Sequence, residues 1–77
     1  MITGAQIRAA RAMLGWSGRA LTKKAHVPEH SLEWIEGDGT IKAKDRSALK
    51  ALQDALEIGG VEFIGSFGVQ LRANKQD

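Results

Sequence analysis

The chain contains no cysteine, which excludes a disulfide framework and any zinc site built on thiolates. Its two histidines, His26 and His30, are too few for a histidine-rich metal cluster, so we expect neither a metal nor another cofactor. No apolar run approaches the length of a membrane span. The first residues also lack the basic and apolar regions of a secretory signal. These absences lead us to expect a cytoplasmic protein without membrane contact.

The machinery of an enzyme is missing as well. We find no set of nucleophile, base and orienting group, and no pair of carboxylates in a plausible cleft. The glycines of Gly37-Asp38-Gly39 follow a predicted helix, whereas a dinucleotide fingerprint follows a strand. We therefore expect that the chain is not an enzyme.

The length of 77 residues predicts one domain spanning residues 1–77. Charge is distributed in blocks along it. Residues 1–28 carry five basic side chains and no acid, residues 29–38 carry four acids and no base, and residues 42–50 are again mostly basic. A protein that binds nucleic acid by charge alone has no need of an acidic segment in its middle.

Local signals predict two helices in the first third of the chain. Thr3 and Gln6 have the spacing of a capping box, and Gly15 is a typical left-handed stop. Ser17 then caps a second helix that runs to about Ala25.

Two more helices are predicted further on. Pro28 suits the first position of a helix over about 29–37, and Gly59-Gly60 ends another over about 45–58. The helical part of the domain thus covers residues 3–58. Apolar residues of these two helices recur at core spacing: Leu32, Ile35, Leu49, Leu52 and Leu56.

After residue 60 the apolar pattern changes to a period of two. Val61–Ile64 and Val69–Arg72 predict two strands, with a four-residue loop, Gly65–Gly68, between them. We expect a β-hairpin over 60–72 followed by a frayed tail, 73–77. Its inner face would cover the helices with Val61, Phe63, Val69 and Leu71.

Two stretches, Ile7–Ser17 and Leu32–Gly39, closely resemble the first helix and the third helix with its loop in XRE-type domains, the phage-repressor/Cro-like family. The resemblance covers about residues 3–58, and the start of the hairpin, Gly60–Ile64, is similar to a tail on small bacterial members. It implies a mainly α fold: a four-helix XRE-type helix-turn-helix domain with a C-terminal two-stranded β-hairpin. It also implies a fold-stabilising ion pair between Arg11 and Glu36, whose loss would cost about 3–5 kcal/mol if the pair is buried.

In the DNA-binding members of this family the third helix enters the major groove. The matching positions here are Glu29, His30, Glu33 and Trp34. None of them is an Arg, Lys, Asn or Gln, the side chains that read guanine and adenine through two hydrogen bonds. Gly18 occupies the place of a common phosphate-clamping Gln.

These residues have less specific explanations too. Glu29 suits the first turn of any helix through the helix dipole. Leu32 and Ile35 already take the core face of the third helix, so we expect Trp34 to be substantially exposed, and the alternative is that it completes the core. A basic rim is available for phosphate contacts but is equally explained as a solvated face: Ser17, Arg19, Lys23, Lys42 and Lys44.

Two functions follow from the resemblance and its departures. The first is a transcription-regulatory protein whose acidic, Trp-bearing third helix binds a protein partner, such as a transcriptional activator, in the manner of an antiactivator. Glu29, His30, Glu33 and Trp34 would form that surface. The alternative is a sequence-specific DNA-binding repressor of the XRE type. The partner, the operator and the oligomeric state stay open.

Overall fold

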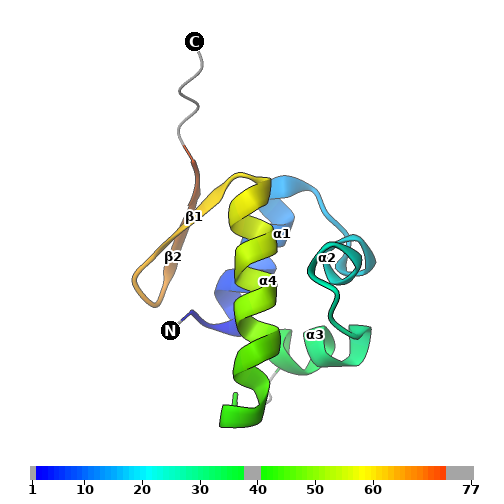
Figure 1. Cartoon of the computed structure of the whole chain (residues 1–77). Coiled ribbons are helices and arrows are strands. Elements are labelled where there is room, and N and C mark those ends of the chain that lie inside the picture. Colours follow the sequence, from blue (N-terminus) through cyan, green and yellow to red (C-terminus); the bar gives the residue numbers. More distant parts are fainter. Residues whose placement is uncertain (1, 38–40, 73–77) are drawn as a thin grey trace.

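The computed structural model describes residues 2–37 and 41–72 of the chain, which form four α-helices followed by a two-stranded antiparallel hairpin (Figure 1). The predicted mainly helical fold with a hairpin after it is confirmed. The predicted tail, 73–77, lies outside the described residues, as does most of the loop after Gly37. The elements are α1 (Gly4–Leu14), α2 (Gly18–Ala25), α3 (Glu29–Glu36), the 3-10 turn η1 (Ala43–Asp45), α4 (Arg46–Gly59), β1 (Val61–Ile64) and β2 (Gly68–Leu71).

The predicted start and end of α1 and the start of α2 are confirmed. The Thr3 hydroxyl accepts a hydrogen bond from the Gln6 amide at 3.2 Å, and the Gln6 side chain accepts one from the Thr3 amide at 2.8 Å. Gly15 ends α1 with φ of 70°. Ser17 Oγ accepts from the Ala20 amide at 3.0 Å and so caps α2. Side chains that bond to nearby backbone, together with a left-handed glycine, therefore set these boundaries.

The boundaries of α3 and α4 differ slightly from the prediction. Pro28 is the cap before α3 and not its first residue, and its extended backbone turns the chain into the helix. A 3-10 turn precedes α4, which extends through Gly59, and Gly60 stops it with φ of 121°. Only glycine adopts that backbone conformation without strain.

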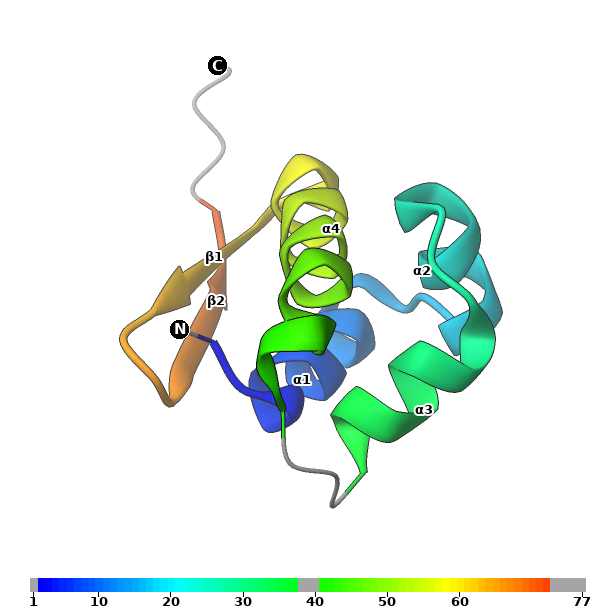
Figure 2. The ribbon, with the colours of Figure 1, turned by 60° about the horizontal axis from the view of Figure 1, so that its bottom comes forward.

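The core forms around α4, which contacts α1, α2, α3 and β1 (Figure 1). Figure 2 shows α2 and α3 on one side of α4 and the hairpin on the opposite side. The predicted core leucines and Ile35 are all buried. The largest side chains that are almost completely buried are Ile7, Leu21, Ile35, Leu52, Leu56 and Val61. Apolar burial of this kind is the main favourable term in the stability of a small helical domain.

The hairpin corrects two predictions. Ile64 pairs with Gly68, so three residues form the turn instead of four, and Gly65 supplies the left-handed position with φ of 58°. Leu71 pairs with Val61 as the alternation requires, but it is 57% exposed, so the covering face ends before the end of β2. Val61 is fully buried.

Two hydrogen bonds fix the hairpin turn to α1. Gln6 Nε2 donates to the carbonyl oxygen of Gly65 at 3.1 Å and to that of Gly68 at 2.8 Å. The same side chain that completes the cap of α1 thereby satisfies two turn carbonyls. Gln6 is buried, so its amide group finds within the protein the hydrogen-bond partners that water would otherwise supply.

Within residues 2–37 and 41–72, none of the helices has the length and apolar character that crossing a membrane requires.

Candidate functional site

Helix α3 is held against α1 at very close range. A Cβ added to Gly4, the first residue of α1, would lie 1.8 Å from the carbonyl oxygen of Ile35. Only a residue without a side chain permits this approach. The buried residues Leu32 and Ile35 face the core, so the opposite face of α3 is directed to solvent.

The end of α3 is fixed to α1 by the ion pair between Arg11 and Glu36. Arg11 Nε donates to one Glu36 oxygen at 2.9 Å and Nη2 donates to the other at 2.8 Å. Arg11 Nη1 also donates to the carbonyl oxygen of Trp16 at 3.2 Å, and Arg8 donates to the carbonyl oxygen of Glu36. The hydrogen bonds to Glu36 raise the pKa of Arg11 above its ordinary value.

The pair is only partly buried, with 23% of the Arg11 side chain and 12% of the Glu36 side chain exposed. A two-pronged geometry gives it more strength than an ordinary surface pair. Because the pair is partly solvated, removing one of the two side chains should lower the free energy of unfolding by about 1–3 kcal/mol, which is less than for a fully buried pair.

Gly18 has a packing role that the sequence did not indicate. A Cβ at this first position of α2 would lie 3.3 Å from Leu32 Cδ2 on α3. The two helices approach closely there, which favours a small residue. Because Leu32 Cδ2 is the end of a flexible side chain, a small shift of it would admit a Cβ at this position.

The four residues predicted to form the partner-binding surface are all exposed: Glu29, His30, Glu33 and Trp34. Trp34 is 49% exposed and lies outside the buried cluster. The predicted exposure of Trp34 is confirmed, and the alternative that it completes the core is wrong. The indole therefore offers apolar area at the surface of α3.

The acids of this face are not equivalent. Glu29 accepts a hydrogen bond from Arg19 Nε on α2 at 3.3 Å, and both side chains are more than half exposed. Glu33, one turn further along α3, forms no ion pair within the part of the chain that the structure describes. The acidic character of the face is consequently concentrated at Glu33.

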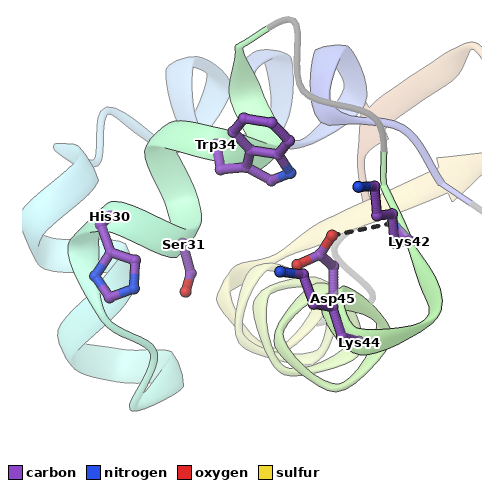
Figure 3. A pocket seen from close by; sticks show the side chains of 6 residues that line it. All are labelled: His30, Ser31, Trp34, Lys42, Lys44 and Asp45. Atoms are coloured by element: carbon purple, nitrogen blue, oxygen red, sulfur yellow. Dashed lines mark hydrogen bonds between the residues drawn. The ribbon is translucent and has the colours of Figure 1, made fainter.

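The basic rim separates into two groups. Ser17 is engaged as the cap of α2 and Arg19 by Glu29, whereas Lys23 is exposed in the last turn of α2. Lys42 and Lys44 lie instead beside α3, across a groove from it (Figure 3). Whether any of these residues contacts phosphate stays a prediction.

This groove has a volume of about 610 Å³, within the range of sites that hold small ligands. His30, Ser31 and Trp34 form its wall on α3, and Lys42, Lys44 and Asp45 line the opposite wall (Figure 3). The Asp45 carboxylate accepts a hydrogen bond from the Lys42 backbone amide at 3.0 Å. The groove thus combines an exposed indole with two ammonium groups.

Sequence reasoning missed Ser31 and Asp45 as groove residues. Asp45 follows Lys42 by three residues, the spacing at which a carboxylate accepts a hydrogen bond from the backbone amide at the start of a helix. This spacing was a signal in the sequence that could have placed Asp45 at the start of η1. Ser31 offered no comparable signal, because only the packing of η1 opposite α3 makes it part of a wall.

The exposed face of α3 and the groove beside it place charged side chains of both signs next to an indole. No group of three or more potential metal-ligating side chains occurs in residues 2–37 and 41–72. Exposed charges of both signs beside an indole are typical of recognition surfaces. Comparison with models of protein families and with curated proteins found no match to the chain.

Proposed function

We propose that this chain is a small transcription-regulatory protein with an XRE-type helix-turn-helix fold, which binds a protein partner through α3. The partner would be a regulatory protein such as a transcriptional activator, and binding would inhibit it by covering a surface that it needs for its own function. The short connection between α2 and α3, with His26 in the left-handed conformation at φ of 58°, supports the helix-turn-helix assignment.

The chemistry of the exposed α3 face is the observation that carries the proposal. It consists of two carboxylates, an imidazole and an indole: Glu29, Glu33, His30 and Trp34. A helix that reads bases in the major groove presents guanidinium or amide groups, whereas Glu33 would bring an exposed carboxylate toward the duplex. Duplex DNA is therefore a poor complement to this face.

A protein surface is a better complement. Trp34 supplies a large, half-exposed apolar ring of the kind that dominates the binding energy of many interfaces. The neighbouring charges at Glu33 and in the groove would fix orientation and raise the association rate. These roles need no change in the fold.

One observation favours the alternative of a DNA-binding repressor. Lys42 and Lys44 stand beside α3, and both are exposed. Lysines flanking a helix in the major groove are well placed to contact phosphates. This second function keeps the same fold and predicts a dominant, salt-sensitive electrostatic component of binding.

The decisive experiment compares two interactions of the same protein. A gel shift and footprint would use DNA upstream of the coding sequence, at physiological salt. A pull-down would compare the wild type with Trp34→Ala and Glu33→Lys variants of unchanged melting temperature. Capture of a protein that both variants lose supports the proposal, and a footprint on one defined operator contradicts it.

A further inference from the structure

We infer that the groove between α3 and η1 receives an acidic, apolar peptide segment of the partner. This inference rests on the proposed function, because it names the chemistry of the partner element that the same surface would take. The groove is lined by His30, Ser31, Trp34, Lys42, Lys44 and Asp45.

The charge of the groove selects an acidic occupant. Neither Lys42 nor Lys44 forms an ion pair with another residue of the described ranges, so both ammonium groups are available to a ligand. The carboxylate of Asp45 is partly occupied by the backbone amide of Lys42, at 3.0 Å. The groove therefore has a surplus of positive charge, and carboxylates are complementary to it.

The opposite wall selects an apolar component. Trp34 exposes about half of its side chain beside the groove, and its ring is directed toward the η1 side in Figure 3. A Phe or Leu side chain laid against this indole would remove apolar surface of both partners from water. One large side chain on the indole, with carboxylates reaching the lysines, fits a volume of about 610 Å³.

A peptide satisfies this geometry better than a nucleic acid backbone does. A duplex would bring a continuous row of phosphates past the exposed carboxylate of Glu33 on the same helix. A short peptide places its negative charges in the groove alone and keeps them away from Glu33. The indole would also have no apolar partner on a phosphate backbone.

The test uses the full chain carrying Trp16→Phe, so that Trp34 is the sole tryptophan and reports on the groove by its fluorescence. The probe is a short synthetic peptide in which Asp and Glu alternate with Phe and Leu. Comparison peptides replace every acid by Lys, or every Phe and Leu by Ser. A DNA duplex of arbitrary sequence is titrated in parallel.

We expect the acidic, apolar peptide to bind and shift the Trp34 emission, the Lys peptide to have no effect, and the Ser peptide to bind about tenfold more weakly. Lys42→Gln with Lys44→Gln should weaken binding about tenfold. The matched control, Lys50→Gln with Arg72→Gln, removes the same charge outside the groove and should leave the affinity unchanged.

Three results would overturn the inference. They are no binding of the acidic peptide, an equal loss of peptide affinity in the two double variants, or binding of the duplex that is tighter than that of the peptide and depends on Lys42 and Lys44. The peptide titration decides this inference by itself. If the peptide fails while Trp34→Ala still loses a captured protein, the proposed function stands without this occupant. A footprint on a defined operator contradicts the proposed function whatever the peptide does.

Discussion

Gly4 of α1 and Ile35 of α3 are in contact through their backbones, at a separation where a Cβ on Gly4 would stand 1.8 Å from the Ile35 carbonyl oxygen. Backbone atoms cannot rotate away as a flexible side chain does. Helices α1 and α3 would have to move apart to admit any side chain at residue 4. The position of α3, and with it the exposed surface that α3 presents, therefore depends on a glycine in a different helix.

Replacing Gly4 by Ala should destabilise the protein by about 1–3 kcal/mol, because the new methyl group overpacks the contact with Ile35. Gly18→Ala is the matched control, since its Cβ would lie 3.3 Å from a Leu32 methyl group that is able to adjust. There the gain in helix propensity, about 1 kcal/mol, offsets the tighter packing. Thermal unfolding of both variants checks this difference, and equal melting temperatures would contradict it.

Gln6→Glu should separate the two roles of this side chain. A glutamate keeps the acceptor for the Thr3 amide but loses the donor that serves the carbonyl oxygens of Gly65 and Gly68. Facing two carbonyl oxygens, the new carboxylate should have a raised pKa in the folded state. The variant should therefore be less stable than the wild type at neutral pH and recover part of the loss as pH falls. Urea unfolding at several pH values measures this, and a loss independent of pH would argue against it.

Arg11→Ala and Glu36→Ala should each lower stability by about 1–3 kcal/mol, through the orphaned charge and lost hydrogen bonds. The double variant should lose less than the sum of the two. Pairing raises the pKa of Arg11, so the pair contributes fully to the free energy of unfolding at any pH below the ordinary pKa of arginine. This contribution is lost only when the pH rises through the raised pKa, under strongly alkaline conditions. Additive losses in the cycle would show that the two side chains do not stabilise each other.

Trp34→Ala should weaken partner binding by about 2 kcal/mol or more while leaving the melting temperature close to that of the wild type. The reason is that the ring is half exposed and outside the core. Phe67→Ala removes an exposed aromatic ring from the hairpin turn and serves as the control, with no expected change in affinity. Calorimetric unfolding and a binding titration are both needed. A destabilised Trp34→Ala protein that binds normally when folded would refute the interface assignment.

Glu29→Lys combined with Glu33→Lys should increase non-specific, salt-sensitive binding to DNA, because it makes the exposed face of α3 positive. The first change also frees Arg19 from its ion pair, which adds to the positive charge beside α3. Glu57→Lys with Glu62→Lys alters the net charge equally on the α4 and hairpin side. If both double variants bind DNA to the same extent, net charge and not the α3 face determines the effect.

Local signals were enough to predict the helices. Capping at Thr3 and Ser17, the left-handed stop at Gly15, and apolar periodicity in α3 and α4 all operate within a few residues. Such signals depend little on the rest of the chain, so they survive in the folded structure. The exposure of Trp34 followed from the same reasoning, because Leu32 and Ile35 already occupied the buried side of α3.

Apart from the Arg11–Glu36 pair, which the family resemblance implied, the polar and close contacts between elements escaped prediction. The pairing of Arg19 with Glu29, the closeness of Gly4 to Ile35, and the groove between α3 and η1 depend on how helices are placed in space. Periodicity shows which side of a helix is buried but not which residue lies opposite. The hairpin turn was predicted one residue too long, since Gly68 is compatible with both loop and strand.

The two hydrogen bonds from Gln6 to the hairpin turn reach far along the chain: Gly65 lies 59 positions after Gln6, and Gly68 lies 62 positions after it. On a ribosome, α1 emerges long before the strands that cover it. Val61, fully buried, likewise joins the core only after α4 is complete. Closing so large a loop late costs entropy that the final contacts must offset. A chain that ended just after Gly59 would leave α1 capped by Thr3 but uncovered on the hairpin side, so the domain should have its full stability only when the hairpin is present.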